Sequence, residues 1–262
     1  NTSEVACPSG TYRNTVGAKS IHDCQICPAG YFCPEATIEY TTKECPAGYI
    51  CPEGTKSAYE RPCYPGTYNP NNQSSIRDHC INCPVGKFCT SGTDIPENCP
   101  SGYYCPLNTD HGYQYPCPSG TYNDGDNLEN SNECTACIKG HYCPSGSITP
   151  ISCPAGTFSN TLNNIDLYDC EPCTTGYSCP DTGTTTITET CSIGHYCPSG
   201  TIYATQYACP AGTYMDDTNA TSAYDCKDCP IGYYCGSATT GLDQPSNPPQ
   251  SCPPGHYCPL KT

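Results

Sequence analysis

Apolar positions are too few and too irregular along this chain to predict helices. Among 262 residues there are 3 Phe, 1 Met and no Trp, and Leu, Ile and Val are sparse. No stretch repeats its apolar residues with the 3.6-residue period of an amphipathic helix. Gly and Pro recur throughout, and they favour turns and short hairpin-like strands. We therefore expect turns and coil to dominate, with little or no helix.

The cysteines supply the regular pattern that the aliphatic residues lack. There are 28, and in chain order every odd-numbered one begins a Cys-x-x-Gly motif and the next one ends the segment. We call them openers and closers, call each pair a module, and expect the motif to mark openers alone. The openers are Cys7, Cys27, Cys45, Cys63, Cys83, Cys99, Cys117, Cys137, Cys153, Cys173, Cys191, Cys209, Cys229 and Cys252. The closers are Cys24, Cys33, Cys51, Cys80, Cys89, Cys105, Cys134, Cys143, Cys170, Cys179, Cys197, Cys226, Cys235 and Cys258.

Module length divides the chain into five repeats. Long modules have 16 residues between opener and closer and begin Gly-Thr-aromatic, whereas short modules have five. Each long module runs into a short one through Cys-x-x-Cys, and a second short module usually follows. Such self-similarity predicts a tandem array in which each module touches its neighbours. The predicted repeats are 1–62, 63–116, 117–152, 153–208 and 209–262, and the third lacks its second short module.

Composition explains what must hold such an array together. A chain so poor in aliphatic residues cannot offset its conformational entropy by burial alone. Its cysteine fraction is that of a disulfide scaffold, and the even count suits an oxidising compartment. We therefore expect an extracellular, secreted or cell-surface protein. Its fold would be an elongated tandem array of small disulfide-rich repeats, with short hairpins, turns and coil and no single hydrophobic core.

Two disulfide patterns compete in the short modules. In the local pattern each opener pairs with its own closer, as in Cys27–Cys33 and Cys45–Cys51. In the crossed pattern Cys27 pairs with Cys45, and Cys33 with Cys51. The third repeat has no second short module, so crossing would strand its cysteines, whereas local pairing treats every repeat alike. The long-module bridges, such as Cys7–Cys24, are common to both patterns.

The charge balance narrows the class of partner. The net charge is −15, and binding to nucleic acid requires clustered Lys and Arg, so we expect no nucleic-acid partner. No apolar run reaches the length of about 18 residues that a membrane span requires, so we expect no span in this segment. The chain shows no start Met and no signal-peptide pattern, and we interpret it as a mature or excised piece of a longer array.

The cysteine motifs resemble a known family. Cys-Pro-x-Gly-Thr-Tyr, a polar loop and then Cys-x-x-Cys-Pro-x-Gly are similar to the ephrin-receptor-like cysteine-rich repeat and, more distantly, to the tumour necrosis factor receptor (TNFR-like) cysteine-rich domain. The resemblance extends from Cys7 to Cys258. It implies a small disulfide-rich fold of receptor ectodomains, matrix-type proteins or surface proteins. It also implies crossed pairing in the second half of a six-cysteine module, from which the four-cysteine third repeat departs.

Few residues are candidates for chemistry. The Cys-x-x-Cys pairs could hold zinc or act as redox dithiols, but each joins a closer to the next opener, so we assign them to different bridges. His141, His195 and His256 share a slot that holds Tyr in other modules, which indicates packing. The acids could form a calcium site or simply solvated loops. The candidate calcium ligands are the acids Asp124, Asp126 and Glu129 with the amide Asn127 in one loop, and the acids Asp216 and Asp217 in another. We expect no cofactor and no enzymatic activity.

Sequons mark candidate glycosylation sites. Asn1, Asn72 and Asn219 begin Asn-x-Ser/Thr triplets. Asn72 and Asn219 lie nine and ten residues after their openers, which predicts exposed tips of equivalent loops. The Thr-rich stretch 184–190 could carry O-linked sugar.

Two functions fit these patterns. The first is a structural protein, a glycosylated disulfide-stapled segment of a fibre (filament), stalk or surface coat that self-associates. The alternative is a receptor-type ectodomain that binds another extracellular protein along one edge, through exposed tyrosines or an unusual module. The third repeat, with its loop 124–129, is the candidate hinge or contact site.

Overall fold

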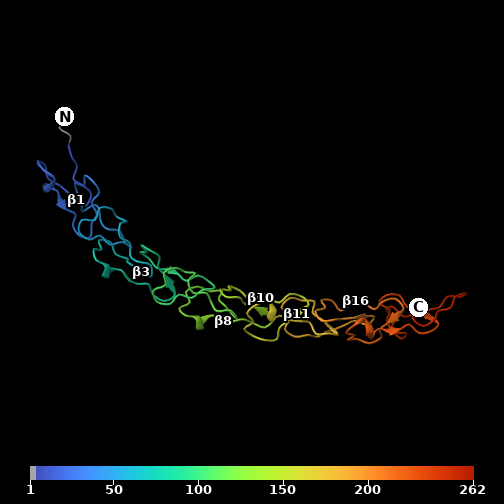
Figure 1. The fold of residues 1–262 in the computed structure, drawn as a ribbon. Coiled ribbons are helices and arrows are strands. Elements are labelled where there is room, and N and C mark those ends of the chain that lie inside the picture. Colours follow the sequence, from blue (N-terminus) through green and yellow to red (C-terminus); the bar gives the residue numbers. More distant parts are fainter. Residues whose placement is uncertain (1–3) are drawn as a thin grey trace. The chain divides into compact units, whose positions relative to one another are not determined.

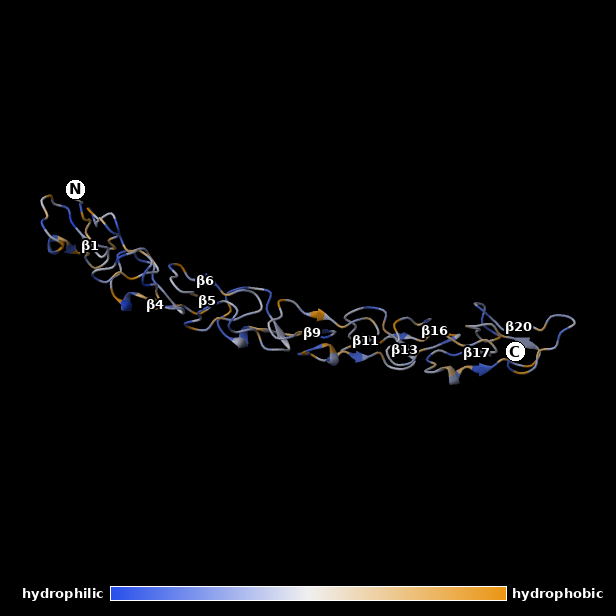
Figure 2. Cartoon of the chain, turned by 45° about the horizontal axis from the view of Figure 1, so that its top comes forward, coloured by the Kyte–Doolittle hydropathy of each residue, from blue (hydrophilic) through white to orange (hydrophobic). Residues whose placement is uncertain are grey.

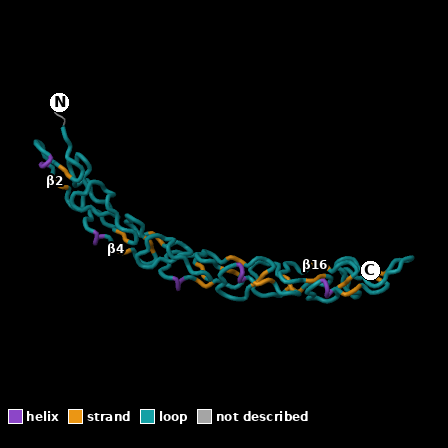
Figure 3. Tube along the Cα trace, viewed as in Figure 1, coloured by secondary structure: helices purple, strands orange, loops and turns teal. Residues whose placement is uncertain are grey.

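The chain forms two compact bodies in the computed structural model, which describes residues 4–262. Body 1 contains 4–118 and 123–135, and body 2 contains 119–122 and 136–262. Within each body the colours of Figure 1 advance steadily along the chain. Loops and turns make up most of each body (Figure 3). The boundaries of the five repeats remain predictions.

Every described strand is two residues long and belongs to a two-stranded sheet. The strands of body 1 are β1 (Thr11–Tyr12), β2 (Gln25–Ile26), β3 (Thr67–Tyr68), β4 (Ile81–Asn82), β5 (Lys87–Phe88) and β6 (Glu97–Asn98). The strand β8 (Thr135–Ala136) lies at the boundary. Those of body 2 are β7 (Thr121–Tyr122), β9 (His141–Tyr142), β10 (Ile151–Ser152), β11 (Thr157–Phe158), β12 (Glu171–Pro172), β13 (Tyr177–Ser178), β14 (Glu189–Thr190), β15 (His195–Tyr196), β16 (Tyr207–Ala208), β17 (Thr213–Tyr214), β18 (Lys227–Asp228), β19 (Tyr233–Tyr234) and β20 (Gln250–Ser251).

One hairpin register recurs in long and short modules. The two residues after the opener glycine pair antiparallel with the two residues before the next opener, as in Thr67↔Asn82 between β3 and β4. The short module gives the same register in Lys87↔Asn98 between β5 and β6. In a long module the second strand is therefore the x-x of Cys-x-x-Cys. This strand separates the two sulfurs, which belong to different bridges as the sequence predicts.

Helical structure is limited to one 3-10 turn before each long-module closer. The turns are Ile21–Asp23, Arg77–His79, Ser131–Glu133, Leu167–Asp169 and Ala223–Asp225. No α-helix occurs among the described residues, and none of their helices is long and apolar enough to cross a membrane.

All 14 disulfides are local. Each opener pairs with the next cysteine, as in Cys27–Cys33 and Cys45–Cys51, and no cysteine is free. The third repeat follows the same rule with Cys117–Cys134 and Cys137–Cys143. The crossed pairing that the resemblance implies is not found.

The expectation that Cys-x-x-Gly marks openers alone is wrong. Glycine also stands three residues after four closers, at Gly54, Gly92, Gly146 and Gly200. These glycines have a positive φ because a second turn follows each short-module closer. Other modules place Ala36, Asn108, Ala238 or Lys261 at the same point, also with positive φ. The motif therefore marks turns of two kinds.

A ladder of backbone hydrogen bonds joins successive modules within each body. The opener glycine donates its N–H to the carbonyl of the residue six positions after the next opener, as in Gly30 to Cys51 at 2.8 Å. The next opener returns a bond to the carbonyl of that glycine, as in Cys45 to Gly30 at 2.9 Å. In body 2, Gly176 and Cys191 repeat this exchange. We call this ladder the spine. Because it uses main-chain atoms, it tolerates varied side chains.

The opener glycine also contacts the module two places further along. A Cβ on Gly48 (φ +81°) would lie 2.1 Å from the carbonyl oxygen of Gly92, and one on Gly30 would lie 2.8 Å from that of Gln73. Any side chain at these positions would collide with backbone. The positive φ favours glycine after every opener, and the close approach adds a second reason at positions such as Gly30 and Gly48.

Bridges replace an aliphatic core, as the composition predicts. All cysteines are buried except Cys7, Cys24, Cys80 and Cys252, which are half-buried. In four long modules the residue six positions after the opener stands where a short module has its closer, and it is buried too: Asn69, Asn123, Ser159 and Met215. Met215 packs with Cys209, Ala220 and Cys226 in a small cluster. Hydrophobic and hydrophilic residues alternate along both bodies (Figure 2).

Candidate interaction surface

The long-module loops are the variable, exposed part of each body, and a carboxylate anchors several of them. Asp225 accepts hydrogen bonds from the backbone N–H groups of Thr221 (2.7 Å) and Ser222 (3.0 Å). The bond from the Thr221 N–H is the main reason that the pKa of the Asp225 carboxyl lies below its usual range. Asp23 has a lowered pKa for the same reason, because the backbone N–H groups of Lys19 and Ser20 donate to it.

Sequence reasoning missed these anchors, although they carry a signal. Asp23, Glu133, Asp169 and Asp225 each stand directly before a long-module closer. An acid at the third position of a short helical turn, with a capping residue before it, is a capping-box pattern. In the second repeat His79 takes this place, and its Nδ1 lies 3.4 Å from the backbone nitrogen of Ser75.

The middle residue of the 3-10 turn projects into solvent. In the fourth and fifth repeats this residue is a tyrosine, Tyr168 or Tyr224, with 94% and 98% of its surface exposed. The loop before Tyr168 also exposes Leu162, Ile165 and Leu167. It is therefore a more apolar loop than the acidic loop 124–129.

Other tyrosines pack against each other. Tyr49 and Tyr59 meet edge to face with centroids 5.1 Å apart, and Tyr103 and Tyr113 repeat the arrangement. Both pairs lie in the second short module of a repeat.

The acidic loop 124–129 is tied to its own body. Asp126 accepts a hydrogen bond from the Nδ2 of Asn98 at 3.0 Å, and Asn127 donates its N–H to Cys99. Asp216 and Asp217 both pair with Lys227, and the hydrogen bond that Lys227 donates to Asp216 is the main cause of the raised pKa of Lys227. Within 4–262 no group of three or more His, Cys, Asp or Glu side chains is placed to hold a metal ion.

The two described sequons differ in geometry, contrary to the expectation of one equivalent point. Asn219 has a positive φ (71°). In the second repeat Gln73 holds this place, and Asn72 lies one residue earlier. The Oδ1 of Asn72 accepts a hydrogen bond from the N–H of Ala47 at 3.0 Å. Both asparagines are exposed. Asn1 lies outside the described residues.

The three slot histidines lie against their own turns. The Nδ1 atoms of His141 and His195 each lie 3.0 Å from the carbonyl oxygen two residues earlier, and that of His256 lies 3.2 Å from the equivalent oxygen. The Nε2 of His141 also lies 3.0 Å from the hydroxyl of Ser152 on β10. The three therefore sit in separate modules with local partners.

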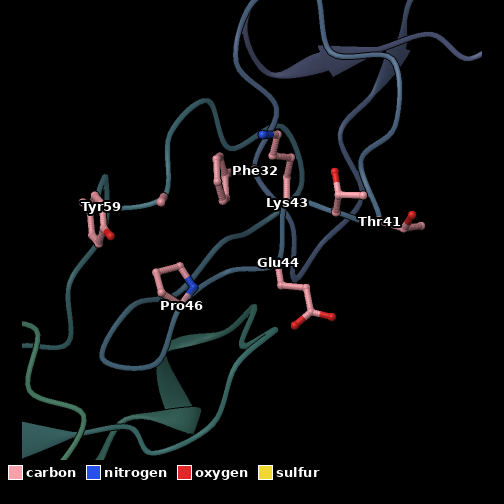
Figure 4. Close-up of a pocket in the computed structure, with 8 residues that line it drawn as sticks. Phe32, Thr41, Lys43, Glu44, Pro46 and Tyr59 are labelled. Atoms are coloured by element: carbon pink, nitrogen blue, oxygen red, sulfur yellow. The ribbon is translucent and has the colours of Figure 1, made fainter.

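Figure 4 shows a shallow hollow in body 1. It has a volume of about 510 Å³ and is lined by Phe32, Lys43, Pro46 and Tyr59 among others. Phe32 lies between Tyr59 and Lys43, and the carboxylate of Glu44 points away from the Phe32 ring.

No protein-family model matches this chain, and no curated protein matches it either.

Proposed function

We propose that this chain is an extracellular structural protein, a repeat segment of a fibre, stalk or surface coat that self-associates. The 14 disulfides fit an extracellular or secreted protein. The observation that carries the proposal is the spine. The same backbone bonds, glycine contacts and local bridges recur in long and short modules, whatever side chains surround them.

In a structural scaffold one part of the chain keeps the fold while another part is free to vary. The spine uses the main chain, so the loops are free to vary without loss of the fold. The resemblance to ephrin-receptor-like and TNFR-like repeats supports a module of this kind at cell surfaces. We include glycosylation of Asn72 and Asn219 in the proposal, because both are exposed. Enzymatic activity forms no part of it.

Electron microscopy of the native material tests the proposal. Fibres, stalks or a regular coat labelled by an antibody to this chain would support it. Labelled material containing only monomers would overturn it. Removal of N-linked sugar from the same material, followed by mass spectrometry, would show whether Asn72 and Asn219 are converted to aspartate.

The alternative is a receptor-type ectodomain that binds a protein. The observation that favours it is the loop of the fourth repeat, which exposes Leu162, Ile165, Leu167 and Tyr168 together. Apolar side chains gathered at a surface are typical of protein contacts. A saturable soluble partner that is lost in an Ile165→Ser/Leu167→Ser variant, but retained when Asp124 and Asp126 are both changed to Asn, would support this function over the first.

A further inference from the structure

We propose that Tyr168 and Tyr224 are sites of oxidative cross-linking between copies of this chain, through dityrosine. The two residues hold the same position, the middle of the 3-10 turn at the end of a long-module loop. With 94% and 98% of their surface exposed, their rings project further into solvent than those of the packed tyrosines. The proposal rests on self-association for the supply of a second copy, but its chemistry can be tested on the isolated protein.

The composition directs oxidation to tyrosine. Thiols and thioethers are the side chains that oxidants usually attack first. Here no cysteine is free, Trp is absent, and the single methionine, Met215, is only 4% exposed. Tyrosine, with 23 copies, is therefore the main exposed side chain that can lose an electron.

The exposed tyrosines differ in how far their rings are free. The rings of Tyr59 and Tyr113 meet those of Tyr49 and Tyr103 edge to face. The guanidinium of Arg77 covers the ring of Tyr64 at 3.8 Å. Coupling joins two rings at the carbons beside their hydroxyl groups, which requires a close approach by a second chain. Tyr168 and Tyr224 permit it because they stand at loop ends.

The reaction requires a peroxide and a haem peroxidase as the oxidant. Each of two phenols loses one electron and one proton to give a phenoxyl radical. The radicals form one carbon–carbon bond between ortho carbons, and the hydrogens on those carbons move to the oxygens, which restores both phenols. The O–O bond of one hydrogen peroxide breaks, and the two electrons and two protons reduce it to two waters.

Two reactive tyrosines in one chain would allow polymers to form. A chain with a single reactive tyrosine can form only a dimer, whereas a chain with two can link to further copies and continue. Tyr257, 89% exposed, could add a third site, so the test uses a Tyr257→Phe background.

The test treats the full chain with a haem peroxidase and hydrogen peroxide, followed by gel analysis, dityrosine fluorescence and peptide mapping. We expect a ladder of oligomers in the Tyr257→Phe background, with Tyr168 and Tyr224 in the cross-linked peptides. Either Tyr168→Phe or Tyr224→Phe should stop the ladder at dimers, and the double variant should lower the dityrosine yield severalfold. As a control, Tyr68→Phe/Tyr122→Phe should leave the ladder intact, since Phe158 occupies the same slot naturally.

A ladder that persists in the Tyr168→Phe/Tyr224→Phe variant, or cross-linked peptides that lack both residues, would overturn the inference. This outcome is distinct from failure of the structural proposal. Native material without fibres would contradict that proposal and leave the reactivity of the isolated chain unchanged.

Discussion

At the scale of single residues, the fold requires glycine where any side chain would collide with the backbone. The opener glycines combine a positive φ with an approach to a carbonyl two modules away, as Gly48 does to Gly92. Gly232 has a similar φ, +87°, but a Cβ there would meet nothing within 4 Å. Comparing substitutions at Gly48 and Gly232 therefore distinguishes the free-energy cost of the backbone conformation from that of the close approach.

We predict that Gly48→Ala destabilises its region far more than Gly232→Ala. Alanine in the left-handed region costs about 1–2 kcal/mol at either site. At Gly48 the added Cβ would also collide with the Gly92 carbonyl and displace a packed module. We estimate the further free-energy cost of this displacement at about 2 kcal/mol or more. Hydrogen exchange of the amides around each site measures the local free energy of opening. Equal effects of the two substitutions would contradict the importance of the close approach.

At the scale of residues, the burial of several polar side chains within the spine could not be predicted from the sequence. Asn69, Asn123 and Ser159 look like loop residues because they are polar, yet they occupy the place of a closing cysteine. The side chain of Asn123 makes both of its hydrogen bonds with a nearby backbone group: its Nδ2 donates to the carbonyl of Gly125, and its Oδ1 accepts a bond from the N–H of Gly125. No signal in the sequence distinguishes such a polar residue from a solvated one, because its burial depends on the next module.

At the scale of elements, hairpins and turns follow from motifs that are visible in the sequence. Gly-Thr-aromatic predicts short hairpins, and the structure has them as two-residue strands. The regular alternation of openers and closers, with the four-cysteine third repeat, favours the local bridges but leaves the crossed pattern open. The crossed pairing implied by the resemblance does not occur, because each module closes on itself within six or 17 residues.

The turn after each short-module closer was harder to predict. Glycine or asparagine marks it in several modules, but Ala36, Ala238 and Lys261 adopt the same positive φ without such a signal. The reason lies in the array. The N–H of this residue bonds an opener carbonyl in the preceding module, as Ala36 does with Cys7, so tertiary contact overrides local preference.

The 3-10 turns should respond to acid. The folded-state pKa of Asp225 is lowered, so its contribution to stability is present above the unfolded pKa and is lost as the pH falls through the folded pKa. We therefore predict faster exchange of the Thr221 and Ser222 amides as the pH falls through that range, after correction for intrinsic exchange. Asp225→Ala should exchange fast at every pH, while Asp217→Ala, which alters an exposed acid outside the turn, should keep the transition. A pH-independent wild type would contradict the anchoring role.

At the scale of the whole molecule, the array is built from neighbour contacts. Within each body a module bonds the next through the spine, and at positions such as Gly30 and Gly48 its glycine also approaches the backbone of the module after that. Bridges that close such short loops stabilise by about 2–3 kcal/mol each in the chain-entropy model. Stability is therefore distributed along the chain, as in other repeat proteins.

A perturbation should stay near its origin in such an array. We predict that Gly48→Ala raises the exchange rates of amides in the adjacent modules, such as those of Cys63 and Asn69, and leaves those of Cys173 and Gly176 at wild-type rates. Hydrogen exchange along the full chain tests this in one experiment. A uniform rise across both bodies would mean that the chain opens as a single cooperative unit, contrary to the array.

The local bridges are the central claim, and cleavage by trypsin without reduction tests them directly. Lys43 lies between Cys33 and Cys45, and Lys56 follows Cys51. Local pairing predicts that the peptide 44–56 is released on its own, with an internal bridge that gains two hydrogens on reduction. If peptide 44–56 instead remains joined to peptide 20–43 until reduction, then Cys24, Cys27 or Cys33 is bonded to Cys45 or Cys51, and the local pairing of each opener with its own closer is wrong.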